Sequence, residues 1–262
     1  MPERTEYAEG TPSWIDLATT GPAAAKQFYG DLFGWTFDDM PAGPDMIYTM
    51  CSKQGRFVAG LSAQPPEQAQ QGVPPMWNTY VTVDDVDSAT KRAENAGGTV
   101  FMAPFDVMDS GRMAVVGDPA GAVVSMWQAR DHIGAQLVNE PGSLCWNELV
   151  TPDVERAKAF YGSTFGWTAE PMEAGGMPYT IFNVAGNAAA GATTPPMEGI
   201  PPHWAVYFAV DDTDATVAQA KARGATVVTE ALDSPAGRMA GLRDPQGAAF
   251  WVIKTPPPGT PT

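Results

Sequence analysis

The sequence predicts an α+β protein of two tandem modules, each a pair of βαβββ units whose strands form one open, curled sheet. Two observations lead to this prediction. The chain contains two copies of one long pattern, and within each copy single helical segments alternate with groups of short strand-like segments. A repeat of this length indicates a duplicated module rather than a solenoid unit.

The repeat can be read directly from the letters. Trp14–Trp35 reads WIDLATTGPAAAKQFYGDLFGW, and Trp146–Trp167 reads WNELVTPDVERAKAFYGSTFGW, 132 residues later. Further along, Gly111–Gly121 shares Gly-Arg-Met-Ala and Asp-Pro-x-Gly with Gly237–Gly247, at a separation of 126 residues. The two copies therefore differ by a few loop residues.

The first unit of the first copy opens with an alternating strand over 13–19. Pro22 suits the first turn of a helix, and apolar residues at i, i+4 and i+8 predict a helix over 23–33 that Gly34 ends. Three strand-like runs follow, over 35–38, 46–51 and 57–62.

The second unit of this copy begins after a loop over 63–75. We expect a strand over 77–83, a helix over 86–96 and three further strands that end near Trp127. The second copy repeats the whole scheme.

These patterns predict the domain organisation. The first module covers 1–128, a linker covers 129–143, and the second module covers 144–254. The Pro-rich tail over 255–262 has little to bury, so we expect it to be disordered.

Composition narrows the function. The net charge of −15 argues against nucleic acid as a partner, because phosphate binding needs clustered Lys and Arg. No apolar run approaches the ~20 residues that span a bilayer, and the acidic start has no apolar h-region. Cys51 and Cys145 are too few for a disulfide framework and indicate small buried side chains in a reducing compartment. We therefore expect a cytoplasmic protein, either a monomer or a homodimer.

Four motifs occur in the same order in both copies. They are a strand-helix opening that ends in Phe-Tyr, a following Phe-Gly-Trp, a Val-Asp-Asp ahead of a helix and an Asp-Pro-x-Gly turn. With them the chain resembles the vicinal oxygen chelate superfamily of glyoxalase I, extradiol dioxygenases and fosfomycin- and bleomycin-resistance proteins. It is most similar to the two-module actinobacterial subgroup often labelled hydroxylase. The resemblance covers about 13–254 and implies sheets curled into cups that hold a small ligand.

The resemblance also implies three metal-ligand positions in each cup. In this chain they hold Trp14, Asn78 and Ser125 in the first module, and Trp146, Ala205 and Trp251 in the second. Indole cannot bind a divalent metal, and Ser and Asn are poor substitutes for imidazole or carboxylate. The chain has only two histidines, His132 and His203. We therefore expect no metal and no cofactor.

Strand alternation predicts what lines the cups instead, because residues i and i+2 share a face. In the first cup we expect Trp14, Asp16, Met76, Asn78, Tyr80, Ser125 and Trp127. In the second we expect Trp146, Glu148, His203, Ala205, Tyr207 and Trp251. Aromatic rings around a few polar groups suit a planar, largely apolar ligand. The alternative is a purely structural role, in which these rings only fill the core and Trp146 and Trp251 close the second cup.

Asp16 and Glu148 are the candidate general bases, with Tyr80, Tyr207 or His203 as acid. A carboxyl group at an inward strand position is either hydrogen-bonded or has a raised pKa, and such groups serve acid–base chemistry. Their alternative role is a structural hydrogen bond to the backbone or a tyrosine. His203 follows two prolines, so its alternative place is an exposed lip of the cup.

Two arginines in a repeated Gly-Arg-Met, Arg112 and Arg238, either clamp a loop or close over an anionic ligand. We favour the loop. The Asp-Pro-x-Gly segments are expected to form turns and to carry no catalysis.

Three functions remain open. The first is a metal-free protein that binds a small molecule for resistance, sequestration or natural-product metabolism. The second is an enzyme, either a metal-independent lyase, isomerase or cyclase, or a glyoxalase-like metalloenzyme with a displaced site at Glu148 and His203. The third is a structural duplicate with both cups filled. The smaller Asn78 and Ser125 favour the first cup as the ligand site.

Overall fold

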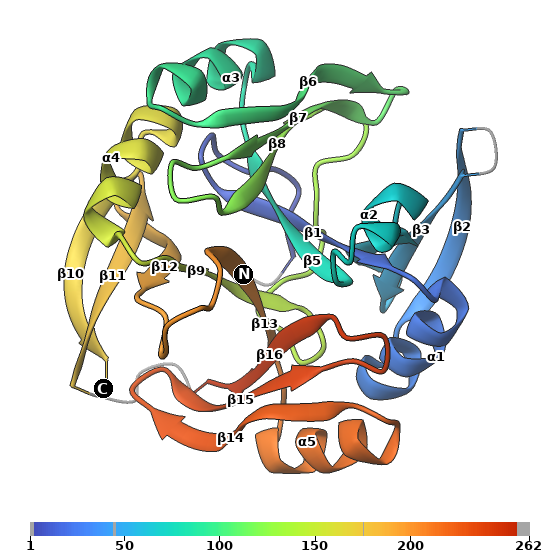
Figure 1. Cartoon of the computed structure of the whole chain (residues 1–262). Helices are drawn as coiled ribbons and strands as arrows, with labels where there is room; N and C mark the ends of the chain where they lie inside the picture. The colour runs from blue at the N-terminus through green and yellow to red at the C-terminus, as the bar shows by residue number, and fades with distance from the viewer. Residues whose placement is uncertain (1–2, 44–45, 175, 256–262) are drawn as a thin grey trace.

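The computed structural model describes residues 3–43, 46–174 and 176–255. The strands form two curled sheets of eight strands each, with five helices at their sides (Figure 1). The two sheets have the same strand order, β2-β3-β4-β1-β5-β8-β7-β6 and β10-β11-β12-β9-β13-β16-β15-β14. The predicted α+β architecture of two tandem βαβββ pairs is confirmed.

The first module is built in chain order from strands and helices that match the predicted positions closely. Its elements are β1 (Pro12–Thr19), α1 (Pro22–Phe33), β2 (Thr36–Gly43), β3 (Met46–Lys53), β4 (Arg56–Ala63), α2 (Pro66–Gln70), β5 (Met76–Thr82), α3 (Val86–Asn95), β6 (Thr99–Val107), β7 (Gly111–Gly117) and β8 (Val123–Ala129).

The second module repeats these elements without a counterpart of α2. They are β9 (Leu144–Val150), α4 (Val154–Phe165), β10 (Thr168–Ala174), β11 (Met177–Val184), β12 (Asn187–Thr193), β13 (His203–Ala209), α5 (Thr213–Ala222), β14 (Thr226–Ser234), β15 (Gly237–Arg243) and β16 (Ala249–Lys254). The predicted disordered tail lies, except for Thr255, outside the described residues.

The short helix α2 lies inside the segment that the sequence analysis predicted as a loop. It has five residues and starts at Pro66, a favoured first position. Five residues are too few to show helical periodicity, so the pattern could not reveal it.

The repeated motifs act as local start and stop signals. The second Asp of each Val-Asp-Asp, Asp85 or Asp212, accepts a hydrogen bond at the helix N-terminus from the backbone N–H three residues on. Gly34 and Gly166 end α1 and α4 in the left-handed conformation that only glycine adopts freely.

The two modules pack crosswise on the helix faces of their sheets. One core joins β1 and α1 of the first module to β13, α5 and β16 of the second. The other joins α3 and β8 of the first module to α4 and β11 of the second. Figure 1 accordingly shows α1 beside α5 and α3 beside α4.

Each crosswise core contains one buried hydrogen bond between repeated motifs. The Tyr29 hydroxyl of the first Phe-Tyr donates to Asp244 of the second Asp-Pro-x-Gly at 3.0 Å. Tyr161 donates to Asp118 in the same way at 3.1 Å. The turns were predicted correctly, because each Asp also accepts backbone N–H groups of its own turn. Their role in joining the modules was not predicted.

None of the helices in the described part of the chain has the length and apolar character of a membrane span.

The buried tyrosine–aspartate bonds give a test of the crosswise packing. Tyr29→Phe removes the hydroxyl that bonds Asp244 and also accepts from Trp77, so we expect the free energy of unfolding to fall by about 1–3 kcal/mol. Tyr161→Phe should cost a similar amount. The two bonds share no partner, so the double variant should be additive in chemical denaturation. No loss in either variant would contradict a stabilising role for these bonds.

Candidate functional site

The first cup is the face of the first sheet turned away from the helices, and Asp16 lies buried at its centre. The Asp16 carboxylate accepts hydrogen bonds from Tyr80 at 2.7 Å and from Asn78 at 2.8 Å. Tyr48 on β3 donates to the same carboxylate at 3.2 Å and itself accepts from Trp14 Nε1 at 2.9 Å. The structure therefore brings together Trp14, Asp16, Asn78 and Tyr80, as alternation predicted.

The second cup repeats this network around Glu148. One Glu148 oxygen accepts from Tyr207 at 2.9 Å, and the other accepts from Tyr179 at 2.8 Å. Tyr179 in turn accepts from Trp146 Nε1 at 3.0 Å. Both modules thus contain one connected chain of indole, phenol, carboxyl group and second phenol.

The two networks differ by one compensating exchange. Asp16 pairs with Asn78 in the strand register, and Glu148 pairs with Ala205 at the corresponding place. The shorter carboxyl side chain has an amide donor opposite it, whereas the longer one faces a methyl group. Both carboxyl groups thus bond two phenols, although they differ in side-chain length and in the residue that lies opposite them.

Sequence analysis did not identify Tyr48 and Tyr179. Both tyrosine rings cross the neighbouring strand at a glycine, and a Cβ at Gly60 or Gly191 would coincide with the tyrosine hydroxyl. The signal was present as a second repeat, since each Tyr-Thr precedes its glycine by the same twelve residues. The glycine exists because the phenol needs that space to reach the carboxyl group.

Burial dominates the electrostatics of both networks. It raises the pKa of Asp16 and of Glu148, and the hydrogen bonds from the phenols and the amide only partly offset this effect. The same burial, together with the adjacent carboxyl group, raises the pKa of Tyr80 and Tyr207 well above the ordinary value. Burial therefore shifts the pKa of all four groups in the same direction, upward from their ordinary values.

The linker covers part of the first cup. The ring of His132 lies edge-on to Trp14, with centroids 4.5 Å apart and planes at 84°. The His132 carbonyl accepts from Trp127 Nε1 at 2.8 Å. Ala135 and Val138 of the linker complete an apolar cluster with Trp14, so the predicted ligand-binding Trp14 and Trp127 are buried by the chain itself.

The second cup leaves more of its rings accessible. Tyr207 and Trp251 stack with centroids 5.3 Å apart and planes at 15°. Trp146, Trp251 and Glu148 are partly exposed, whereas Trp14, Trp127 and Asp16 of the first cup are buried. The preference for the first cup was based on the sizes of Asn78 and Ser125 and did not include the linker, so this geometry does not support it.

The remaining predicted residues lie where alternation placed them. Ser125 is buried beside Tyr80 on the adjacent strand β8, and Met76 is exposed opposite Ala18. His203 is a half-buried residue at the start of β13, and its Nδ1 lies 2.9 Å from the Pro201 carbonyl. His203 lies two residues before Ala205, the strand partner of Glu148, and so on the same face.

The donor set of neither cup fits a divalent metal. Catalytic zinc sites use three protein ligands, mostly imidazole and carboxylate. Each network has a single carboxyl group, and its oxygens already accept from protonated phenols. Within the described residues no three His, Cys, Asp or Glu side chains gather as a metal site, and Glu148 with His203 supplies two.

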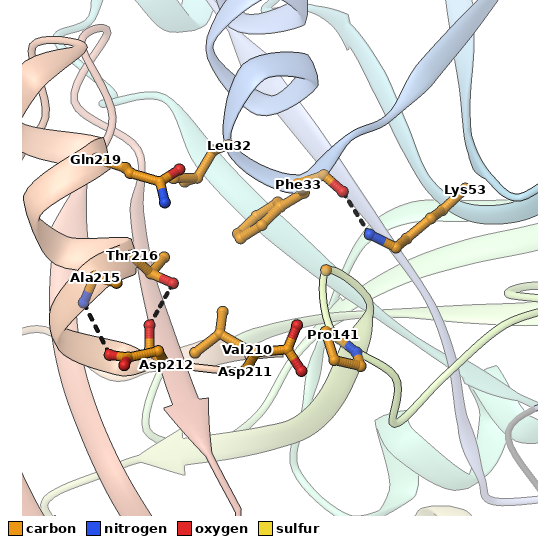
Figure 2. A pocket seen from close by; sticks show the side chains of 11 residues that line it. Leu32, Phe33, Lys53, Pro141, Val210, Asp211, Asp212, Ala215, Thr216 and Gln219 are labelled. Carbon is orange, nitrogen blue, oxygen red and sulfur yellow. Dashed lines mark hydrogen bonds between the residues drawn. The ribbon is translucent and has the colours of Figure 1, made fainter.

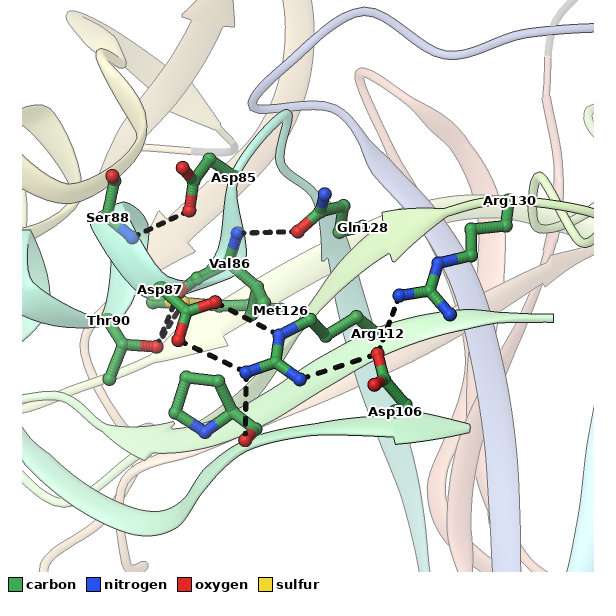
Figure 3. A network of polar contacts seen from close by, with 11 residues as sticks. Asp85, Val86, Asp87, Ser88, Thr90, Asp106, Arg112, Met126, Gln128 and Arg130 are labelled. Carbon is green, nitrogen blue, oxygen red and sulfur yellow. Dashed lines mark hydrogen bonds and ion pairs between the residues drawn. The ribbon is translucent and has the colours of Figure 1, made fainter. Parts of the chain in front are cut away.

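The arginines of the repeated Gly-Arg-Met bind carboxylates on a helix and a strand of their own module, rather than the loop that the sequence analysis favoured. Arg112 makes a two-pronged contact with Asp87 of α3 at 3.0 and 3.2 Å, and it also reaches Asp106 of β6 at 3.4 Å (Figure 3). Arg238 binds the corresponding pair, Asp214 and Asp233. Both guanidinium groups are therefore neutralised by carboxylates of their own module rather than free for an anionic ligand.

A pocket of about 200 Å³ lies outside both cups, at the seam between the modules (Figure 2). Lys53 and Phe33 stand on one side of it, and Asp211 and Gln219 on the other. Lys53 donates to the Phe33 carbonyl at 2.7 Å, so its ammonium group binds the C-terminus of α1. The pocket is smaller than the ~300–1,000 Å³ of typical ligand sites.

Comparison with known proteins agrees with this fold. The chain matches the Glyoxalase/Bleomycin resistance protein/Dioxygenase superfamily over residues 11–126 and again over 131–252. The chain belongs to this superfamily, as its repeated motifs indicated.

Two relatives match over nearly their whole length. A Mycobacterium tuberculosis protein named "Putative glyoxylase CFP32" is 50% identical over 260 residues, which cover 98% of this chain and 99% of the relative. The "Anthracycline biosynthesis protein DnrV" of Streptomyces peucetius is 40% identical over 264 residues, which cover 95% of each chain.

Solved structures agree in fold at low identity. A Mn(II)-bound glyoxalase from Novosphingobium aromaticivorans has a TM-score of 0.65 at 17% identity, covering 95% of this chain and 83% of that one. A 2,2',3-trihydroxybiphenyl 1,2-dioxygenase from Sphingomonas wittichii has a TM-score of 0.63 at 12% identity, covering 94% and 91%.

The glycine under each bridging tyrosine can be tested directly. Gly191→Ala places a methyl group where the Tyr179 hydroxyl lies, so we expect a loss of about 1–3 kcal/mol in the free energy of unfolding. In a Tyr179→Ala background the same substitution should cost much less, because the ring is gone. Equal costs in both backgrounds, measured by chemical denaturation, would show that the glycine does not serve the tyrosine.

The raised pKa of Glu148 predicts a pH dependence of stability. The folded state holds the proton more tightly than the unfolded state, whose carboxyl group has the ordinary value of 4.5. The stability contributed by this proton is therefore complete below pH 4.5 and is lost as the pH rises through the folded pKa. Glu148→Gln should lack this loss, so the variant should gain stability relative to the wild type across that window. A constant difference from pH 4 to pH 8 would contradict the raised pKa.

Proposed function

We propose that this protein binds a planar, largely apolar small molecule in its second cup and does so without a divalent metal. The observation that carries the proposal is the partly exposed ring of Trp251, which stacks on the buried ring of Tyr207 beside the carboxyl group of Glu148. Trp146 on the adjacent strand is also partly exposed. Accessible aromatic rings around one hydrogen-bonding group are typical of sites for small aromatic ligands.

The network around Glu148 supplies the polar end of such a site. The phenol hydroxyls donate hydrogen bonds, and the phenol and carboxyl oxygens accept them. A ligand hydroxyl or carbonyl that reaches Glu148, Tyr179 or Tyr207 would therefore find both kinds of partner. The rings would set the plane of the ligand, and this network would set its direction within that plane.

Two further observations support the proposal. The first concerns binding without a metal, and the second concerns a polycyclic ligand. The donor set of each cup is one carboxyl group held by phenols, which is a poor metal site. A relative of almost equal length is named for anthracycline biosynthesis, a chemistry of planar hydroxylated quinones.

A metal-independent enzyme is the second candidate function. In it Glu148 would accept a proton from the bound ligand, and Tyr207 or His203 would return one. The specific support is the raised pKa of Glu148, which brings a carboxyl group closer to the neutral range in which general bases work. Asp16 is the corresponding group of the first cup.

Titration with 2,3-dihydroxyanthraquinone, whose hydroxyls are free to bond with the protein, tests the binding proposal. We expect the dye to quench tryptophan fluorescence equally before and after dialysis against EDTA. Trp251→Ala should weaken binding about tenfold or more, since aromatic pairing of ~0.5–1.5 kcal/mol is lost together with apolar contact. Trp14→Phe in the first cup is the matched control and should change nothing. Weakening by Trp14→Phe alone would place the ligand in the first cup.

A single variant distinguishes an enzyme from a protein that only binds its ligand. Glu148→Gln keeps the shape of the side chain but cannot accept a proton as a base. If the protein is an enzyme, turnover of its substrate should be lost while dye affinity stays within about threefold. Unchanged turnover in Glu148→Gln would exclude Glu148 as the base.

A further inference from the structure

The first cup contains an aromatic ring of the chain itself, held as a ligand would be. Besides its edge-on contact with Trp14, the His132 ring lies 5.8 Å from the ring of Trp127 and 6.0 Å from that of Phe57. Its Nε2 is buried with no hydrogen-bond partner among the described residues, and burial lowers its pKa to about 4. His132 therefore occupies this place as a neutral, essentially apolar ring.

The second cup has an indole, that of Trp146, where the first has Trp14, and we call this indole the platform. It lacks the other aromatic side chains that enclose the His132 ring in the first cup. Trp146 corresponds to Trp14, and its indole N–H is held by Tyr179 as that of Trp14 is held by Tyr48. The counterparts of Phe57 and Trp127 are much smaller: they are Ala188 and Ile253. These two positions therefore leave space beside the platform that aromatic rings fill beside Trp14. The second cup has a much larger side chain where Trp251 replaces Ser125, and that ring stacks on Tyr207.

The backbone confirms that these positions correspond. β4 and β12 each carry a register shift at the same point, where Phe57 pairs with Ser52 and Ala188 pairs with Asn183. Phe57 consequently lies on the cup face, and Ala188 occupies the equivalent site and is exposed. Ile253 belongs to the apolar cluster that contains Trp146.

We propose that an aromatic ring of the ligand lies edge-on against Trp146 in the second cup, in the space that His132 fills in the first. This inference rests on the proposed function, because it specifies how the same cup holds its ligand. Around this ring subsite, Ala188, Ile253 and Met239 are apolar, and the indole N–H of Trp146 already bonds Tyr179. The two polar side chains nearby also have partners of their own: Cys145 donates to the Tyr207 carbonyl, and Ser234, at the place of Val107, donates to the Gly237 carbonyl. The ring is therefore unsubstituted, and the polar groups of the ligand lie at its other end, toward Glu148.

This arrangement selects a chemical class. A fused polycyclic compound with hydroxyl or carbonyl groups at one end and a bare terminal ring at the other satisfies both halves of the site. Polar groups at both ends would place a hydroxyl in the ring subsite without a partner, which weakens binding. 2,3-Dihydroxyanthraquinone has the favoured pattern, and 2,3,6,7-tetrahydroxyanthraquinone has hydroxyls at both ends. In neither compound can a hydroxyl reach a quinone carbonyl of its own molecule.

The test compares these two compounds on the wild-type protein by fluorescence titration. We expect the dihydroxy compound to bind at least tenfold more tightly than the tetrahydroxy compound. Equal affinities, or tighter binding of the tetrahydroxy compound, would overturn the ring subsite. Failure of the wild type to bind either compound would overturn the proposed function as well.

One substitution then locates the subsite. Ala188→Phe restores the side chain that the first cup carries at this position and fills the space beside Trp146, so affinity for the dihydroxy compound should fall at least tenfold. Ala188→Ser is the matched control and should bind within about twofold of the wild type. Because Ala188 is exposed, both variants should keep the wild-type Tm. Wild-type affinity in Ala188→Phe would overturn the placement of the ring while leaving binding in the cup intact.

Discussion

Each cup buries one carboxyl group among aromatic rings, and the need to satisfy that group shapes its surroundings. An unpaired carboxyl in such a place costs several kcal/mol, so donors must reach it from neighbouring strands. Tyr80 and Tyr207 do so from the adjacent central strand, and Tyr48 and Tyr179 do so across a whole strand. The glycines of β4 and β12 and the orientation of Trp14 and Trp146 follow from this requirement.

Much of this arrangement could be predicted from sequence because it depends on local periodicity. Alternation along β1 and β5 placed Asp16, Asn78 and Tyr80 on one face, and the repeat supplied Glu148 and Tyr207 by correspondence. The bridging tyrosines could not be predicted in this way. Their positions depend on which residues of β3 and β4 pair with each other, and no periodicity within one strand encodes the pairing of two strands.

The packing of the linker over the first cup could not be predicted from the sequence either. The linker over the first cup carries few apolar residues and reads as a connection, yet it places His132 against Trp14. Once the linker had closed one cup, the two copies were under different constraints. The two cups keep the same hydrogen-bonded frame but differ in its surroundings. One pairs Asp16 with Asn78 and carries Phe57, and the other pairs Glu148 with Ala205 and carries Ala188.

The crosswise cores have a consequence for how this chain exists as a unit. Because each core takes one half from either module, neither module can bury its helix face by itself. The chain behaves as a dimer whose subunits are tethered, and the tether fixes their effective concentration. The pairing of the two modules is therefore independent of protein concentration, unlike the pairing of separate chains in an obligate dimer, which dissociates on dilution. A tether also lets the halves change separately, so that one can be specialised as scaffold while the other binds.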